Sequence, residues 1–183
     1  MMLRTSTAVS LGFGMALIAT GAGAQQTSLK EQIVGTWMTT SWEQTLPDGS
    51  KLHRFGETPK GVNVFLPDGR FFVMFARPDL PKLSSNNPMK PTPQEAEAIQ
   101  TGSIAYFGTY TVDEHARTIS MRVDISTLPN QVGVPQPRKI TAMSASEMRY
   151  ENATPIAGGR IEVALKRAPA ATTTGAGSMG RPN

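Results

Sequence analysis

The segment GTWMTTSWE, residues 35–43, decides how the rest of the chain is interpreted. It follows a run, Ser28 to Ile33, in which Ser28 stands three residues before Glu31, the spacing of a helical capping box. Gly35 then ends the helical turn, and threonine and tryptophan, which favour strands, follow it. The segment therefore predicts a short N-terminal helical turn that leads directly into a first β-strand.

Further strand-like runs follow as far as residue 167, each bounded by turn residues. The clearest pair is residues 62–66 and 70–75, because Pro67-Asp68-Gly69 between them is a hairpin turn signal. Apolar and polar residues alternate along several runs, which is typical of an antiparallel sheet with one buried face. Eight or nine short strands with little helix predict an all-β barrel or sandwich. The residues expected to face its interior are Val62, Val64, Leu66, Ile104, Tyr106, Gly108, Tyr110, Val112, Ile119, Met121, Val123, Ile125, Ile161, Val163 and Leu165.

Residues 71–75 are apolar at every position, so both faces of this strand need cover. A long loop over about residues 76–101 follows directly, rich in proline and small polar residues and with room for a short helix at 94–100. We expect this loop to fold back over the outer face of the strand. A partner subunit is the alternative, and the sequence leaves the oligomeric state open.

The two ends of the chain differ from the middle. Arg4 precedes an apolar run without charges, and Ala22-Gly23-Ala24 forms an A-x-A cleavage pattern, so residues 1–24 are predicted to be a secretory signal peptide. An uncleaved anchor is the alternative, but the run falls short of the roughly 20 residues of a spanning helix. Residues 168–183 contain little apolar bulk and predict a disordered tail. The expected domain is therefore residues 25–167 of an exported protein, periplasmic or secreted.

Composition excludes several kinds of site. The chain has 183 residues, no cysteine and a formal net charge of +4, which fits one domain without disulfides, thiol nucleophiles or thiolate metal ligands. Its basic residues are scattered, so nucleic-acid binding is not expected. His53 and His115 stand far apart, with Glu57 the one acid expected near His53, so no metal site is predicted. No nucleophile or phosphate-binding motif is present, and no cofactor is expected.

A series of short motifs occurs in a characteristic order along the chain: Gly35-Thr36-Trp37, Pro67-Asp68-Gly69-Arg70, Arg77-Pro78-Asp79, Ile104-Ala105-Tyr106-Phe107-Gly108-Thr109-Tyr110, Val112-Asp113-Glu114, Pro129-Asn130 with Gly133, and Arg138. In these motifs the chain resembles a known family, the bacterial lipocalin-like domain proteins. The resemblance extends over roughly Leu29 to Arg167 and implies an antiparallel barrel with a central cavity for small apolar molecules.

The resemblance also implies how one end of the barrel is closed. In lipocalins the motif tryptophan packs at the closed end beneath a basic residue of the last strand. Here Arg167 has the same strand parity as Val163 and Leu165, so it is the residue expected over Trp37. Gly35, Trp37 and Arg167 are therefore the predicted closure residues.

Candidate ligand-binding residues follow from strand parity. If Trp37 faces inward, Thr39 and Ser41 face inward with it, while Glu43 lies near the mouth. The other inward candidates are Tyr106, Tyr110, Met121 and Val123. The predicted partner is a small hydrophobic molecule.

The leading hypothesis is an exported, non-catalytic protein that binds a small apolar or amphipathic ligand in the barrel cavity. One alternative is an isomerase or cyclase that acts on a small hydrophobic substrate in the same cavity, favoured if polar side chains converge on a deep pocket. Another is an envelope-associated structural or interaction module, favoured if the strand at residues 71–75 leaves an apolar patch exposed.

Overall fold

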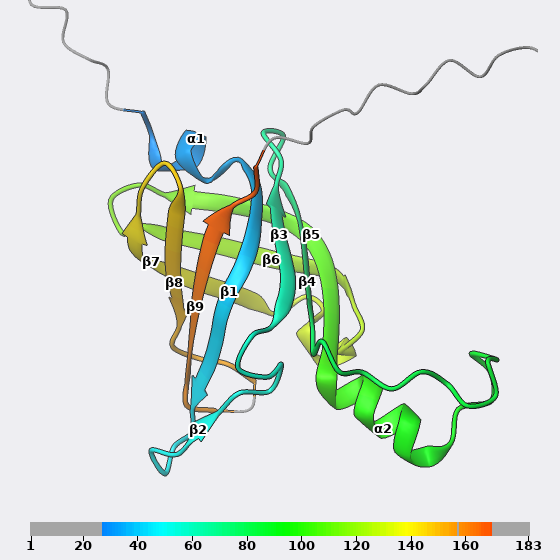
Figure 1. Ribbon diagram of the computed structural model, residues 1–183. Coiled ribbons are helices and arrows are strands. Elements are labelled where there is room, and N and C mark those ends of the chain that lie inside the picture. Colours follow the sequence, from blue (N-terminus) through cyan, green and yellow to red (C-terminus); the bar gives the residue numbers. More distant parts are fainter. Residues whose placement is uncertain (1–26, 157, 170–183) are drawn as a thin grey trace, which may run out of the picture.

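The strands of the chain pair with their neighbours in sequence and then close on themselves (Figure 1). The computed structural model describes residues 27–156 and 158–169. Eight strands form a closed antiparallel barrel in which β9 pairs with β1, and β2 adds to the edge of β1, which confirms the predicted all-β barrel. The elements are α1 (Leu29–Ile33), β1 (Gly35–Thr45), β2 (Lys51–Leu52), β3 (Lys60–Phe65), β4 (Arg70–Ala76), α2 (Pro93–Gly102), β5 (Ser103–Asp113), β6 (Thr118–Ser126), the 3-10 turn η1 (Pro129–Gln131), β7 (Pro135–Met143), β8 (Glu147–Asn152) and β9 (Arg160–Arg167).

The predicted signal peptide, residues 1–24, lies outside the described residues. The predicted tail also lies outside them, apart from Ala168 and Pro169. Across the part of the chain that the structure describes, no helix has the length and apolar character needed to cross a membrane.

The helix α1 lies across one end of the barrel (Figure 1). Its N-terminus has the predicted capping box, in which the Ser28 hydroxyl accepts from the Glu31 backbone N–H and the Glu31 carboxylate accepts from that of Ser28. Glu114, from the turn between β5 and β6, accepts hydrogen bonds from the first two helical N–H groups at 2.7 and 2.9 Å. Two side chains of the helix itself, Leu29 and Ile33, are buried. Local capping and one acidic residue of the barrel thus fix α1 over the end.

Three β-bulges decide which side chains face the interior. In β1, the register against β9 shifts between Thr39 and Ser41, so Thr39 and Trp42 are both buried while Ser41 is exposed. The prediction that Ser41 faces the interior with Trp37 is therefore wrong, because the extra residue at the bulge reverses the alternation. Similar shifts occur in the pairing of β5 with β6 and of β7 with β8.

Two predicted interior faces are corrected. In β3, Asn63 and Phe65 are buried, and Val62, Val64 and Leu66 are not. The reason is register: Asn63 lies opposite Trp37 and Val73, and cross-strand partners share a face. In β6, the bulge turns Ile125 outward, where it is 60% exposed.

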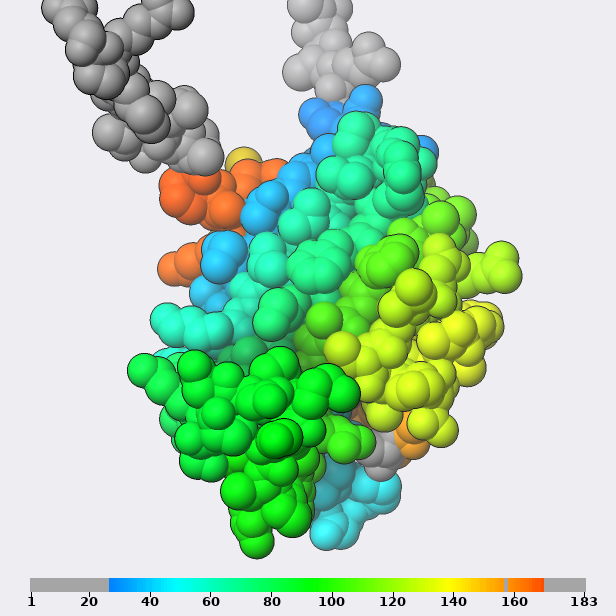
Figure 2. Space-filling view, turned by 90° about the vertical axis from the view of Figure 1, so that its right-hand side faces the viewer, coloured from blue at the N-terminus to red at the C-terminus, as the bar shows by residue number. Residues whose placement is uncertain are grey.

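The outer wall of the barrel carries an uncovered apolar row. Val64, Phe72, Phe107 and Ile125 lie side by side across β3 to β6, and Phe72 is 39% exposed. The segment after β4 extends away from the barrel and forms the predicted helix, α2, instead of folding back (Figure 1). In Figure 2 this green segment lies below the outer wall of β3 and β4 and leaves it open. The expectation that the loop covers this face is wrong.

Candidate functional site

The barrel interior is solid at the end under α1 and hollow at the other end. Fully buried side chains fill the sealed half: Trp37, Phe65, Val73, Ile119, Met148 and Leu165. Beyond them lies a cavity of about 110 Å³, whose lining extends to Ile156 in the loop before β9. Ile156 is 50% exposed, so the cavity reaches the surface at the end opposite α1.

Aromatic and aliphatic side chains form one wall of this cavity. Phe55 comes from the connection between β2 and β3 and is 1% exposed. Its ring stacks on Phe75 at 5.4 Å between centroids and meets Trp42 edge-on at 4.9 Å. Ile104 and Val163 complete this wall, which suits the apolar part of a ligand.

Polar side chains of β7 and β8 form another part of the lining, the polar wall. Gln136 and Arg138 project inward from β7, and Asn152 from β8, with exposed fractions of 3%, 5% and 3%. An Nη2 group of Arg138 donates to Gln136 Oε1 at 3.3 Å, and Nη1 donates to the Pro137 carbonyl at 3.1 Å. Within the described residues, Arg138 makes no ion pair with a carboxylate. The cavity is therefore lined by a buried positive charge and several hydrogen-bonding groups.

A chain of hydrogen bonds forms the floor of the cavity. The Tyr150 hydroxyl donates to Asn63 Oδ1 at 3.2 Å, and Asn63 Nδ2 donates to Thr39 Oγ1 at 3.4 Å. Burial raises the pKa of the Tyr150 phenol far above its usual value, the neighbouring Tyr106 acts in the same direction, and Arg138 opposes them only in part. Tyr150 is therefore neutral and serves as a hydrogen-bond donor.

Arg54 lies at the mouth and connects it to α2. Its Nε and Nη2 groups donate to the carbonyls of Thr101 at 2.7 Å and Gln100 at 3.1 Å, at the C-terminal end of the helix. A cation suits this end of a helix dipole. The guanidinium also lies 5.1 Å from the centroid of Phe55, so one side chain joins the mouth, the aromatic wall and α2.

A comparison of sequences identifies the family to which this barrel belongs. A family model described as a lipocalin-like domain matches residues 34–173. The chain belongs to the lipocalin-like domain family. Its barrel is of a kind that binds small ligands in general. No curated protein matches the chain.

Solved structures with a similar arrangement include designed and natural proteins. A redesigned β-barrel is 16% identical with a TM-score of 0.43, over 79% of this chain and 98% of that one. A protein from Bacteroides uniformis ATCC 8492 is 17% identical with a TM-score of 0.41, over 75% and 90%. A de novo designed fluorescence-activating β-barrel is 12% identical with a TM-score of 0.41, over 78% and 99%.

One predicted ligand-binding residue of the lipocalin-like barrel lines its cavity, and this is Tyr106. Tyr110 lies near the sealed end instead, where its hydroxyl donates to the Leu66 carbonyl at 2.8 Å and its ring meets Phe65 edge-on. The turn between β3 and β4, which holds Leu66, is at the same end as α1 (Figure 1). Tyr110, a predicted ligand-binding residue, therefore packs the closed end and does not line the cavity.

The other predicted residues lie around the cavity without lining it. Thr39 belongs to the hydrogen-bonded floor. Met121 and Val123 are buried in the barrel wall, with exposed fractions of 3% and 1%, and are absent from the cavity surface. Ser41 lies on the outer wall, as described above.

The three closure residues meet at the sealed end of the barrel. The Arg167 guanidinium lies 4.1 Å from the Trp37 ring centroid and donates to the carbonyls of Val34 at 2.9 Å and Gln32 at 2.7 Å. Gly35 has a φ of +132°, and a Cβ atom there would lie 2.6 Å from Arg167 Nη1. Gly35 is thus required both for its backbone conformation and for the space that Arg167 occupies.

The polar wall has little signature in the sequence. Gln136 lies between Pro135 and Pro137, and prolines are typical of loops and edge strands. The one sequence signal for these inward side chains is strand parity. Arg138 stands two residues before Ile140, and Tyr150 two residues after Met148, so each lies on the same strand face as an apolar residue. An arginine in phase with apolar residues is ordinarily placed at the surface, so its burial became visible only in the barrel.

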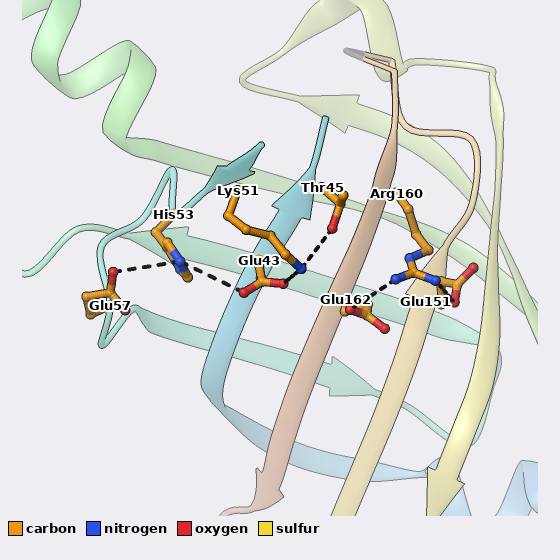
Figure 3. A network of polar contacts seen from close by, with 8 residues as sticks. All are labelled: Glu43, Thr45, Lys51, His53, Glu57, Glu151, Arg160 and Glu162. Atoms are coloured by element: carbon orange, nitrogen blue, oxygen red, sulfur yellow. Dashed lines mark hydrogen bonds and ion pairs between the residues drawn. The ribbon is translucent and has the colours of Figure 1, made fainter. Parts of the chain in front are cut away.

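A second polar group lies on the outer surface (Figure 3). His53 Nε2 is 3.9 Å from Glu43 and 3.7 Å from Glu57, and Lys51 forms an ion pair with Glu43 that lowers the pKa of that carboxyl. Arg160 extends the network to the acids of β8 and β9. These side chains are largely solvated, so their pairs contribute little to stability. No cluster of three metal-ligating side chains occurs among the residues that the structure describes.

The buried phenol predicts how stability changes at alkaline pH. The folded protein holds Tyr150 neutral, whereas the unfolded chain can ionise it above its ordinary pKa of 10.0. The contribution of the neutral Tyr150 phenol to the free energy of unfolding is complete below pH 10. Above that pH it declines by up to about 1.4 kcal/mol per pH unit, because the unfolded chain ionises and the folded protein does not. Urea unfolding from pH 8 to 11 should therefore show a steeper alkaline decline for the wild type than for Tyr150→Phe. Equal slopes would contradict a buried, neutral phenol.

Proposed function

We propose that this protein is exported and that it binds a small apolar or amphipathic ligand in the barrel cavity without transforming it. The observation that carries the proposal is the division of the interior, which is packed solid beneath α1 and hollow toward the mouth. A cavity with an apolar wall and a few directed polar groups is the usual construction of a small-molecule site. Export is supported by the signal-peptide pattern of residues 1–24.

A cavity-filling substitution tests the proposal. Ile104→Trp places a larger side chain in the wall and should lower the affinity for the neutral fluorescent probe N-phenyl-1-naphthylamine by at least about tenfold. The matched control is Ile125→Trp, because Ile125 lies on the outer surface of the neighbouring strand. Fluorescence titration gives the affinities, and native mass spectrometry gives the stoichiometry. A wild-type protein that takes up no probe, or equal affinities for both variants, would count against binding in the cavity.

A cyclase or isomerase is the second candidate, and the convergence of polar groups favours it. Arg138 and Tyr150 face the cavity together and could stabilise negative charge on a carbonyl oxygen. The described lining contains no carboxylate or histidine that could act as a base near neutral pH, which favours a ring closure that needs only polarisation over proton abstraction. Turnover separates the candidates, because a carrier binds about one ligand per chain and an enzyme converts a large excess.

The third candidate, an interaction module, is supported by the outer apolar row formed by Val64, Phe72, Phe107 and Ile125. This row lies on the opposite side of the wall from the cavity, so the two activities are compatible.

A further inference from the structure

The interior of the barrel holds a positive charge without a negative one. Arg138 is 5% exposed, and its two hydrogen bonds go to neutral oxygens, those of Gln136 and the Pro137 carbonyl. The buried polar side chains of the described chain are Thr39, Gln44, Asn63, Gln136, Arg138 and Asn152, a set without aspartate or glutamate. The neighbouring phenol of Tyr150 cannot compensate the charge, because burial raises its pKa and keeps it neutral.

Such a charge is costly to bury. A guanidinium does not lose its proton in proteins, so it cannot become neutral as a buried lysine can. A buried charge without an opposite charge is strongly destabilising in general, and proteins keep such groups mainly where an ion or a ligand supplies the missing charge. Arg138 also lines the cavity, so a bound ligand can reach it.

We infer that Arg138 binds the carboxylate of an otherwise apolar monoanionic ligand, and this inference rests on the proposed function in ligand binding. The fork of guanidinium N–H groups matches the two oxygens of a carboxylate. Tyr106 and Gln136 flank the head group, and the tail lies against Trp42 and Phe55 on the apolar wall.

The number of available cations limits the ligand to one negative charge. The described cavity lining has two arginines, Arg54 and Arg138. Arg54 is occupied by the carbonyls of Thr101, Gln100 and, at 3.5 Å, Ser103. Arg54 is half-buried at the mouth, whereas Arg138 is the one buried cation of the described lining, which favours a monocarboxylate over a phosphate monoester, with its nearly two negative charges.

The test compares two ligands of equal chain length that differ in the head group. Octanoate and 1-octanol are titrated at pH 7.5 into purified protein preloaded with N-phenyl-1-naphthylamine, and displacement gives their affinities. The wild type should bind octanoate at least about tenfold more tightly than octanol. Arg138→Met should lower the octanoate affinity by about 30-fold and change the octanol affinity by less than about threefold. The control is Arg149→Met, because Arg149 is exposed on the adjacent strand β8 and should leave both affinities unchanged.

The outcomes are distinguishable. If the wild type binds the probe and both ligands with equal affinity, Arg138 does not select an anion, and this inference fails while the proposed function stands. If the wild type binds neither the probe nor the ligands, both fail. Should Arg138→Met not fold, Arg138→Lys keeps the charge without the fork. In that variant, a smaller but retained preference for octanoate supports the inference, and a preference for octanol with an unchanged probe affinity overturns it.

Discussion

Replacing Trp37 by alanine is expected to lower the free energy of unfolding by about 3–5 kcal/mol. The Trp37 side chain is fully buried, its ring lies beneath the Arg167 guanidinium, and its Nε1 donates to the Ile33 carbonyl at 2.8 Å. Removing the indole leaves a cavity in the solid half of the barrel and takes away one of the contacts that hold α1 over the end. Guanidinium denaturation followed by circular dichroism measures the loss.

A double-mutant cycle separates the stacking from the packing. Arg167→Met keeps most of the side-chain volume and removes the charge, so its coupling with Trp37→Ala reports the cation–π contact, expected at about 1 kcal/mol. Independent, additive effects of the two substitutions would show that the stack contributes nothing beyond packing.

The Trp37→Ala variant also isolates the fluorescence of the other tryptophan. The chain has two tryptophans, so in this variant the tryptophan fluorescence comes from Trp42 alone and reports on the cavity wall.

Gly108→Ala is expected to cost about 3 kcal/mol, which is large for the addition of one methyl group. Gly108 lies at the bulge between β5 and β6, and a Cβ atom there would be 2.0 Å from the backbone oxygen of Arg122. The nearest atoms all belong to the backbone of Arg122 and Asp124, which cannot move aside as the end of a flexible side chain can. The two strands must therefore separate. The same denaturation experiment measures the effect.

Gly49→Ala is the matched control, because it isolates backbone strain from steric overlap. Gly49 has a φ of +85°, yet a Cβ atom there would have no neighbour within 4 Å. Its cost should be limited to the strain of the left-handed conformation, about 1 kcal/mol. Equal costs at the two glycines would show that β5 and β6 have more freedom at the bulge than their register indicates.

The fold was largely accessible from the sequence, because its signals are local. The capping box at Ser28 and Glu31 and the turn at Pro67-Asp68-Gly69 each depend on residues a few positions apart. Burial of the cavity lining depends on contacts across the barrel instead. Tyr106 lines the cavity, whereas Ser41 faces outward because of a bulge and Tyr110 packs the sealed end, since strand parity does not tell which end of a strand is open.

The sequence alone determined the barrel, and its resemblance to the lipocalin-like family indicated Gly35, Trp37 and Arg167 as closure residues. The ends of the first and last strands bring these residues together. Only the tertiary structure decided what the interior contains. An unbroken alternation assigns one face to the core, but each bulge adds a residue to one strand and reverses the assignment beyond it. The burial of Arg138 without a counter-charge is likewise a property of the closed barrel. It depends on side chains from several strands, which surround Arg138 only when the barrel closes.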